Sequence, residues 1–194
     1  MLILASSSIY RKELLSRIIE DYQIEIPDID ESKYDHEDAK TSAIRLAIEK
    51  AEKIALTLPD SFIIGADQTA ESNHIQINKP NNYEEAFEQL KKLSGKDVSF
   101  YSAICLICKS KKIKYEYVSE VNVKYKDLNE NEIESYLKYE EPYGCLGCIK
   151  SEGLGISLLE KVSSDDPTAI IGLPLIALSQ MLKDSGIKLK SEQR

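Results

Sequence analysis

Short apolar segments alternate with amphipathic segments along the chain, and this alternation constrains the fold more than any other feature. Residues 2–5 and 62–66 are apolar runs of the length expected for buried strands, whereas residues 38–58 repeat apolar side chains at helical spacing. Two more strands are predicted at residues 98–108 and 115–123. The other predicted helices are residues 83–93, 129–139 and 173–182. Strands that alternate with helices predict an α/β fold with a mixed sheet.

The connecting segments predict shorter structures. Residues 22–26 alternate between polar and apolar side chains like a strand. The strand at residues 62–66 is expected to end there and to place Asp67 at its carboxyl end, and residues 69–78 predict a hairpin around Ser72-Asn73. Residues 151–160 predict a strand that is interrupted by glycines.

The composition is that of a globular protein with a sizeable core. A folded chain of 194 residues buries roughly 70% of the surface that it exposes when unfolded. Hydrophobic residues make up 42% of the chain and charged residues 30%, which excludes global disorder. Because no internal repeat or flexible linker divides the sequence, we expect a single domain over residues 1–194.

The charge and the apolar runs limit the partners. A net charge of −8 argues against nucleic acid or an anionic membrane, because proteins that bind them usually carry basic surfaces. The longest apolar run, residues 169–178, is shorter than the roughly 20 residues that span a bilayer. The first residues lack the basic leader of a secretory signal. We therefore expect a cytoplasmic protein with reduced cysteines.

The four cysteines form two C-x-x-C pairs, Cys105/Cys108 and Cys145/Cys148. The spacing alone is compatible with a zinc site or a redox site, and a zinc-binding interaction module is one alternative function. The first pair lies in a predicted strand, where residues three apart point to opposite faces, so we expect two buried thiols. Glycines around the second pair allow the chain to turn back on itself.

Serines follow the first predicted strand and precede a helix. Ser6–Ser8 would place hydroxyls and unpaired N–H groups at a positive helix end, which favours an anion. Arg11 and Lys12 oppose the helix dipole there, which is reasonable if an anion binds between them. The alternative is that Ser8 only caps the helix and that Arg11 is solvated.

Acidic and basic residues elsewhere fit a polyphosphate site. Glu31 and Asp67 are oxygen donors of the kind that hold a divalent cation, and Asp67 can also orient or deprotonate water. Lys50 and Lys79 would neutralise phosphate oxygens. Ligands of α/β folds bind at the carboxyl ends of strands, which predicts that Ser6 and Asp67 share a cleft. The alternative is that Asp67 caps a turn and that the lysines are ordinary surface residues.

Short blocks at compatible spacing extend from residue 2 to about residue 182. They are LILASSSIYRKELL at residues 2–15, Asp30-Glu31, Glu49-Lys50-Ala51, IGADQ at 64–68, Lys79-Pro80, LSG at 93–95, KSEGLG at 150–155 and IGLPL at 171–175. In order and content these blocks resemble the signature blocks of the Maf-like nucleotide pyrophosphatases. The chain departs from that pattern at Ile9, which replaces a proline, at Lys12, which replaces an arginine, and at Asn78, which replaces a glycine.

The resemblance implies a twisted mixed sheet flanked by helices, with a substrate cleft between two lobes and often a homodimer. It also implies cleavage of nucleoside triphosphates between the α and β phosphates with a divalent cation, Mg²⁺ or Mn²⁺. Asp67 matches the catalytic acidic residue of the family. The matching phosphate-binding positions are Ser6, Arg11, Lys50 and Lys79, and the matching metal positions are Glu31 and Asp67.

Tyr10, Gln68 and Glu152 stand at positions that mark substrate specificity in the family, and here they resemble the branch acting on 7-methyl-GTP. A tyrosine ring attracts the positively charged methylated base. A carboxylate at Glu152 accepts both adjacent donors of a guanine edge. Alternatively, Tyr10 packs on its helix and Glu152 is a surface acid. The other functions to weigh are hydrolysis of dTTP or UTP and regulation of cell division with little catalysis.

Overall fold

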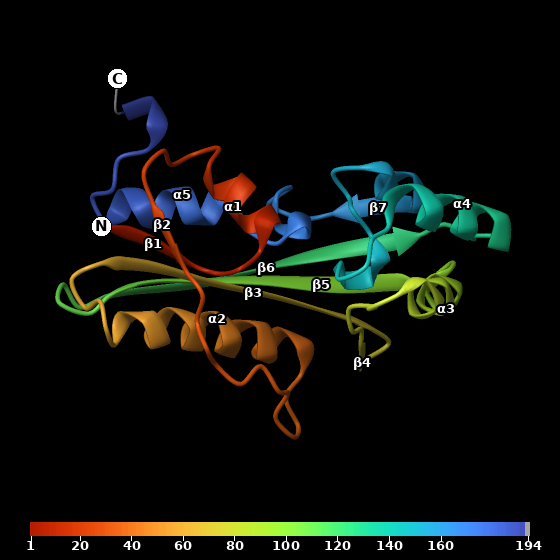
Figure 1. The fold of residues 1–194 in the computed structure, drawn as a ribbon, viewed down its shortest axis with the longest axis horizontal. Helices are drawn as coiled ribbons and strands as arrows, with labels where there is room; N and C mark the ends of the chain where they lie inside the picture. The colour runs from red at the N-terminus through yellow and green to blue at the C-terminus, as the bar shows by residue number, and fades with distance from the viewer. Residues whose placement is uncertain (193–194) are drawn as a thin grey trace. The chain divides into compact units, whose positions relative to one another are not determined.

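The structure is a computed structural model that describes residues 1–192, and in these residues seven strands form one sheet (Figure 1). The strand order is β2-β1-β3-β5-β6-β7, and β4 pairs with β3. The strands are β1 (Leu2–Ala5), β2 (Gln23–Glu25), β3 (Phe62–Ser72), β4 (Ile75–Gln76), β5 (Asp97–Cys108), β6 (Ile113–Tyr125) and β7 (Leu159–Ser163). Because β1 pairs in parallel with β2 and β3, whereas β4 and β7 pair antiparallel with their neighbours, the predicted mixed α/β sheet is confirmed.

Five α-helices and short 3₁₀ helices accompany the sheet within residues 1–192. The α-helices are α1 (Ile9–Leu15), α2 (Ala39–Ala55), α3 (Tyr83–Leu93), α4 (Glu130–Glu140) and α5 (Leu175–Asp184). The 3₁₀ helices are η1 (Leu146–Cys148), η2 (Leu154–Leu158), η3 (Ala169–Ile171) and η4 (Lys190–Glu192). The helices predicted near residues 38–58, 83–93, 129–139 and 173–182 are therefore confirmed, with small differences at their ends. None of the helices in this part of the chain is long and apolar enough to cross a membrane.

The chain divides into two compact units, each built from separate stretches of sequence. The first unit contains Met1–Gln68, Tyr101–Ser119 and the chain from Asp166 onward. The second unit contains Thr69–Phe100 and Glu120–Asp165. Strands β3, β5 and β6 each contribute residues to both units.

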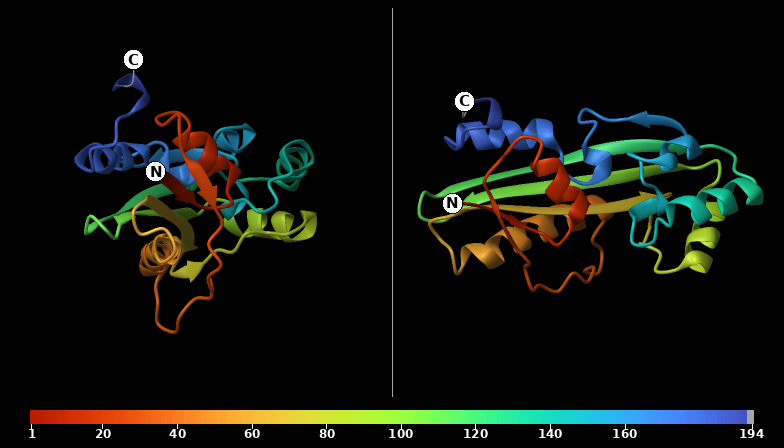
Figure 2. Two further views of the ribbon diagram at one scale, coloured as in Figure 1. Left: turned by 60° about the vertical axis from the view of Figure 1, so that its left-hand side comes forward. Right: turned by 45° about the horizontal axis from the view of Figure 1, so that its top comes forward.

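The first unit has three layers, with α1 and α5 on one face of the sheet and α2 on the other (Figures 1 and 2). Alternate residues of β1 point to opposite faces of the sheet. Leu2 and Leu4 join the core beneath α1 and α5, whereas Ile3 and Ala5 join the core beneath α2. The apolar run at residues 2–5 is therefore continuous because this strand is covered on both sides.

Strand β3 is longer than the sequence predicts. The expected strand end before Asp67 is wrong, because β3 continues through this residue into the first arm of the hairpin that it forms with β4. No glycine or proline lies between Gly65 and the end of β3 at Ser72, so nothing breaks the strand and the two predicted pieces form one strand. Strand β1 ends at Ala5, opposite Gly65, so Ser6 and Asp67 both follow this last register pair.

The second unit contains the β3–β4 hairpin, helices α3 and α4, and β7 paired with β6. The predicted strand over residues 151–160 is wrong: this stretch forms a turn, then η2, and only the last two of its residues begin β7. Gly155 explains the difference, because a Cβ there would lie 2.7 Å from the backbone nitrogen and oxygen of Lys150. The chain is coiled tightly at this point, which an extended strand would not permit.

A missing side chain brings α2 close to β3. A Cβ placed on Gly65 would lie 2.0 Å from the carbonyl oxygen of Ala47 and 2.7 Å from the backbone nitrogen of Ala51. Helix α2 therefore rests directly on the backbone of β3 at this position. The neighbour of Ala51 on α2 is Lys50, so this close approach also sets how far the Lys50 side chain must reach.

We predict that Gly65→Ala lowers the free energy of unfolding by about 3 kcal/mol, the upper end of the range for overpacking, because the methyl group meets rigid backbone. Urea unfolding measures the loss. Gly153→Ala is the matched control, since its Cβ would meet only the carboxylate end of the Glu140 side chain, which can shift more easily than backbone, and should cost clearly less. Equal losses for the two variants would contradict the explanation.

Candidate active site

A buried lysine joins two carboxylates in the first unit. Lys50 Nζ lies 2.6 Å from Asp67 Oδ1 and 2.8 Å from Glu31 Oε1. The side chains of Lys50 and Asp67 are only 7% and 10% exposed, whereas that of Glu31 is 59% exposed. A buried charge is tolerated only with partners, so the ammonium and the Asp67 carboxylate depend on each other. Of the predicted group of Glu31, Lys50, Asp67 and Lys79, the first three therefore lie in contact in the structure, and their roles stay predictions.

Each member of this group comes from a different element. Lys50 lies on α2, Asp67 on β3, and Glu31 in the loop between β2 and α2. Helix α2 begins where Asp38 accepts a hydrogen bond from the backbone nitrogen of Thr41, as an N-cap residue does. Two rigid elements therefore position Lys50 and Asp67, and a loop supplies the third charge.

Arg45 anchors the loop that carries Glu31, and sequence reasoning missed this residue. Its guanidinium donates to both carboxylate oxygens of Glu37, at 2.7 and 2.9 Å, and to the carbonyl of Ser32 at 3.0 Å. The guanidinium also lies 3.9 Å from the centre of the Tyr34 ring. The hydrogen bond from Arg45 lowers the pKa of Glu37, despite an opposing effect of burial. The only local signal was the i,i+4 spacing to Glu49, which pairs with Arg45 at 3.1 Å.

Arg11 is held in place rather than solvated. Its Nη1 donates to Ser6 Oγ at 3.3 Å and its Nε donates to the carbonyl of Gly172 at 3.0 Å. Ser8 Oγ accepts from the Arg11 backbone nitrogen at 3.4 Å, so the capping role of Ser8 is also correct. Burial lowers the pKa of Arg11, while the charges of Asp67 and Glu31 raise it, which places these two carboxylates within electrostatic reach of the guanidinium.

The side-chain amide nitrogen of Gln68 forms hydrogen bonds within the first unit. Its Nε2 lies 2.9 Å from Ser102 Oγ, 3.1 Å from the carbonyl of Ala169 and 3.0 Å from that of Ile170. Ser102 donates its own hydroxyl to Ala169. Gln68 therefore fixes the η3 turn, which precedes the Gly172 carbonyl that holds Arg11.

Asp166 and Thr168 hold the other end of the same turn, and sequence reasoning assigned them no site role. The carboxylate of Asp166 accepts from the backbone nitrogens of Thr168 at 3.0 Å and Ile176 at 2.7 Å. The Thr168 hydroxyl accepts from the Leu175 nitrogen at 2.9 Å and lies 2.7 Å from Asp166 Oδ1. Because Gly172 lies between these anchored residues, the carbonyl that orients Arg11 is fixed from both sides.

The donor set of the first unit suits a hard divalent cation that arrives with phosphate. Within residues 1–192 there is no cluster of three or more His, Cys, Asp or Glu side chains that would bind a metal by itself. Magnesium, however, usually needs only one or two protein carboxylates when phosphate oxygens and water complete its shell. Glu31 and Asp67 already converge on one cation, the Lys50 ammonium, so their oxygens fit this requirement.

The remaining predicted site residues are distributed over both units. Tyr10 lies half-buried on α1, beside Arg11. Lys79 and Glu152 belong to the second unit, where both are exposed. Lys79 lines a pocket of about 450 Å³ together with Pro80 and residues of α3. The roles of these three residues stay predictions.

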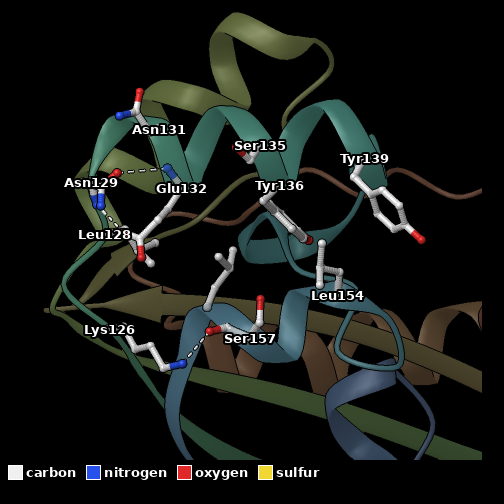
Figure 3. A pocket seen from close by; sticks show the side chains of 11 residues that line it. Lys126, Leu128, Asn129, Asn131, Glu132, Ser135, Tyr136, Tyr139, Leu154 and Ser157 are labelled. Atoms are coloured by element: carbon white, nitrogen blue, oxygen red, sulfur yellow. Dashed lines mark hydrogen bonds between the residues drawn. The ribbon is translucent and has the colours of Figure 1, made fainter.

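A larger pocket of about 630 Å³ lies in the second unit between α4 and η2 (Figure 3). Its lining includes Tyr136, Tyr139 and Leu154 but none of the predicted site residues. Its lysine, Lys126, donates to the carbonyl of Ser157 at 2.7 Å. Asn129 caps α4, and the Glu132 carboxylate accepts a hydrogen bond from the Asn129 backbone nitrogen. With its basic group already engaged, this pocket does not suit a triphosphate.

The comparisons with known proteins agree with this description. A family model described as "Maf-like protein" matches residues 1–185. A relative from Nitrosospira multiformis, named 7-methyl-GTP pyrophosphatase, is 45% identical over 97% of this chain and 95% of its own. Relatives with the same name from Cupriavidus pinatubonensis and a Polaromonas species are 44% and 40% identical, over 95% and 99% of this chain and 93% and 88% of their own.

We predict that Thr168→Val lowers the free energy of unfolding by about 1–3 kcal/mol, because it leaves the Leu175 nitrogen and the Asp166 carboxylate short of a partner. Chemical denaturation measures the loss. Thr168→Ser keeps the hydroxyl and should retain most of the stability. If the valine variant were as stable as the serine variant, the hydroxyl would not be holding the turn.

Proposed function

The chain belongs to the Maf-like family, and from this premise we propose that it is an enzyme that hydrolyses 7-methyl-GTP to 7-methyl-GMP and pyrophosphate. Relatives with this name are 40–45% identical over nearly the whole chain. The observation that carries the chemistry is the buried Lys50 between Asp67 and Glu31, with Arg11 held nearby. Two positively charged side chains beside two carboxylates suit a ligand in which a polyanion is bound to a divalent cation. They suit this combined ligand better than they suit a polyanion alone or a cation alone.

In this proposal Asp67 positions and activates the attacking water. Its Oδ1 binds Lys50, and a carboxylate has a second oxygen that accepts a hydrogen bond or a proton from water. Arg11 and Lys50 offset the charge that develops on the leaving pyrophosphate. Ser6 and Arg11 would bind phosphate oxygens together, since they already contact each other. Lys79 would add a further positive charge at the phosphates, as the family pattern implies.

A divalent cation, Mg²⁺ or Mn²⁺, would be held by Glu31 and Asp67 and would neutralise phosphate charge when bound. Tyr10 would attract the cationic base and Glu152 would accept from its two donors. Gln68 would contribute to specificity through its side-chain oxygen and by fixing the turn that orients Arg11. A homodimer and a cytoplasmic location stay predictions.

A panel of nucleotides with Mg²⁺ or Mn²⁺ tests the reaction. We expect 7-methyl-GTP to react fastest and to release pyrophosphate, whereas release of orthophosphate would contradict the proposed bond cleavage. Asp67→Asn should lower kcat by about 100-fold or more, the scale of general-base catalysis. Asp60→Asn, at an exposed aspartate of the same unit, is the control and should keep full activity.

Glu152→Gln tests how the base is selected. Exchanging a carboxylate for an amide replaces one acceptor by a donor, so the ratio of 7-methyl-GTP to UTP turnover, compared as kcat/KM, should fall by about tenfold or more. Glu160→Gln, at another exposed glutamate of the second unit, should leave the ratio unchanged. An unchanged ratio for Glu152→Gln would remove this residue from base recognition.

A further inference from the structure

The two C-x-x-C pairs have the same spacing but different backbone conformations. Cys105 and Cys108 lie within the extended strand β5, whereas Cys145 and Cys148 bracket a tight turn that includes η1. All four residues are thiols in the structure. Backbone conformation, rather than sequence spacing, therefore decides which pair can form a disulfide.

The pair in β5 is separated in space. Three residues of a strand advance about 10 Å, beyond the roughly 7 Å between Cα atoms that a disulfide tolerates. The side chains also lie on opposite faces of the sheet. Cys105 packs in the core beneath α2, and Cys108 packs in the core beneath α1 and α5. These two thiols have no route to each other while the strand is intact.

The pair at η1 is brought together. The backbone nitrogen of Cys148 donates to the carbonyl of Cys145 at 3.2 Å, an i to i+3 contact that brings the two Cα atoms within about 7 Å. Gly147, with φ at 67°, supplies the left-handed conformation that such a turn requires. This separation falls within the range that disulfide geometry accepts.

The two thiols differ in access. Cys145 is half-buried, whereas Cys148 is fully buried. The Cys148 thiol donates to Gln89 Oε1 at 2.8 Å on α3. Burial, with a smaller effect of Cys145, raises the pKa of Cys148 to about 12. An oxidant would therefore reach Cys145 first, and Cys148 would act as the resolving thiol.

We propose that Cys145 and Cys148 are an oxidation site at which a peroxide converts the two thiols into a reversible intramolecular disulfide. The thiolate of Cys145 attacks hydrogen peroxide, the O–O bond breaks, and a sulfenic acid and hydroxide form. The sulfur of Cys148 then attacks the sulfenic sulfur, the S–O bond breaks, and the departing hydroxide takes the Cys148 proton as water. Two thiols and one peroxide thus give one disulfide and two waters.

The site lies next to the segment that carries Glu152. The carbonyls of Gly147 and Cys148 accept the hydroxyls of Tyr125 and Tyr136, and Tyr136 in turn accepts from the backbone nitrogen of Lys150. Oxidation removes the S–H donor that binds Gln89 on α3. The chemistry follows from local geometry in the second unit and does not depend on the proposed enzymatic function.

The test oxidises the native full-length protein with hydrogen peroxide, alkylates the remaining thiols after unfolding, and maps the peptides by mass spectrometry. We expect a Cys145–Cys148 disulfide that dithiothreitol reverses, with Cys105 and Cys108 alkylated. In Cys148→Ser, dimedone should trap a sulfenic acid on Cys145. Oxidation in urea is the matched control, because both pairs have equal spacing in an unfolded chain and should then link comparably.

Each other result overturns the proposal. A native protein in which neither pair links, or in which both link equally, would show that the turn does not direct the reaction. Over-oxidation of Cys145 to a sulfinic acid without a link would show that Cys148 does not act as its resolving thiol.

Discussion

The burial of the Lys50 ammonium is the constraint on which the rest of the first unit depends. A charged group with 7% of its side chain exposed must be paired, because removing one partner of a buried ion pair typically costs about 3–5 kcal/mol. Asp67 is that partner, and it is almost equally buried. The pair forms only because α2 lies directly on β3, which in turn requires that residue 65 has no side chain.

The positive and negative charges around this pair balance each other, which determines how a polyanion could bind there. Lys50 and Arg11 are opposed by Asp67 and Glu31, so the unit carries no excess positive charge at this place. A triphosphate must therefore compete with the carboxylates for the two cations. A divalent cation on the carboxylates would release the lysine and the arginine toward phosphate, which is the physical reason to include one in the proposed mechanism.

Local patterns in the sequence predicted the elements well, and long-range contacts were where prediction failed. Apolar periodicity found β1, β5, β6 and most helices, because these patterns report burial directly. It divided β3 in two, since a polar Asp67 inside a buried strand looks like a strand end. It also missed the coiled turn at Lys150–Gly155, where close backbone contacts replace the expected strand.

The candidate site shows the same difference between local patterns, which could be predicted, and long-range contacts, which could not. The grouping of Glu31, Lys50 and Asp67 was predicted from residue types and from family resemblance. The supports around it join residues far apart in sequence: Arg11 and Gly172 are 161 positions apart, and Gln68 and Ala169 are 101 apart. No periodicity or short motif encodes such pairs, so Arg45, Ser102, Asp166 and Thr168 were given no role in the site.

The most direct test of the central claim is a crystal structure of the protein with Mg²⁺ and an analogue of 7-methyl-GTP whose α and β phosphates are joined by a methylene group. We predict that the triphosphate contacts Lys50 and Arg11 and that the cation binds Glu31 and Asp67. A triphosphate bound elsewhere, with the ion pair between Lys50 and Asp67 undisturbed, would contradict the account.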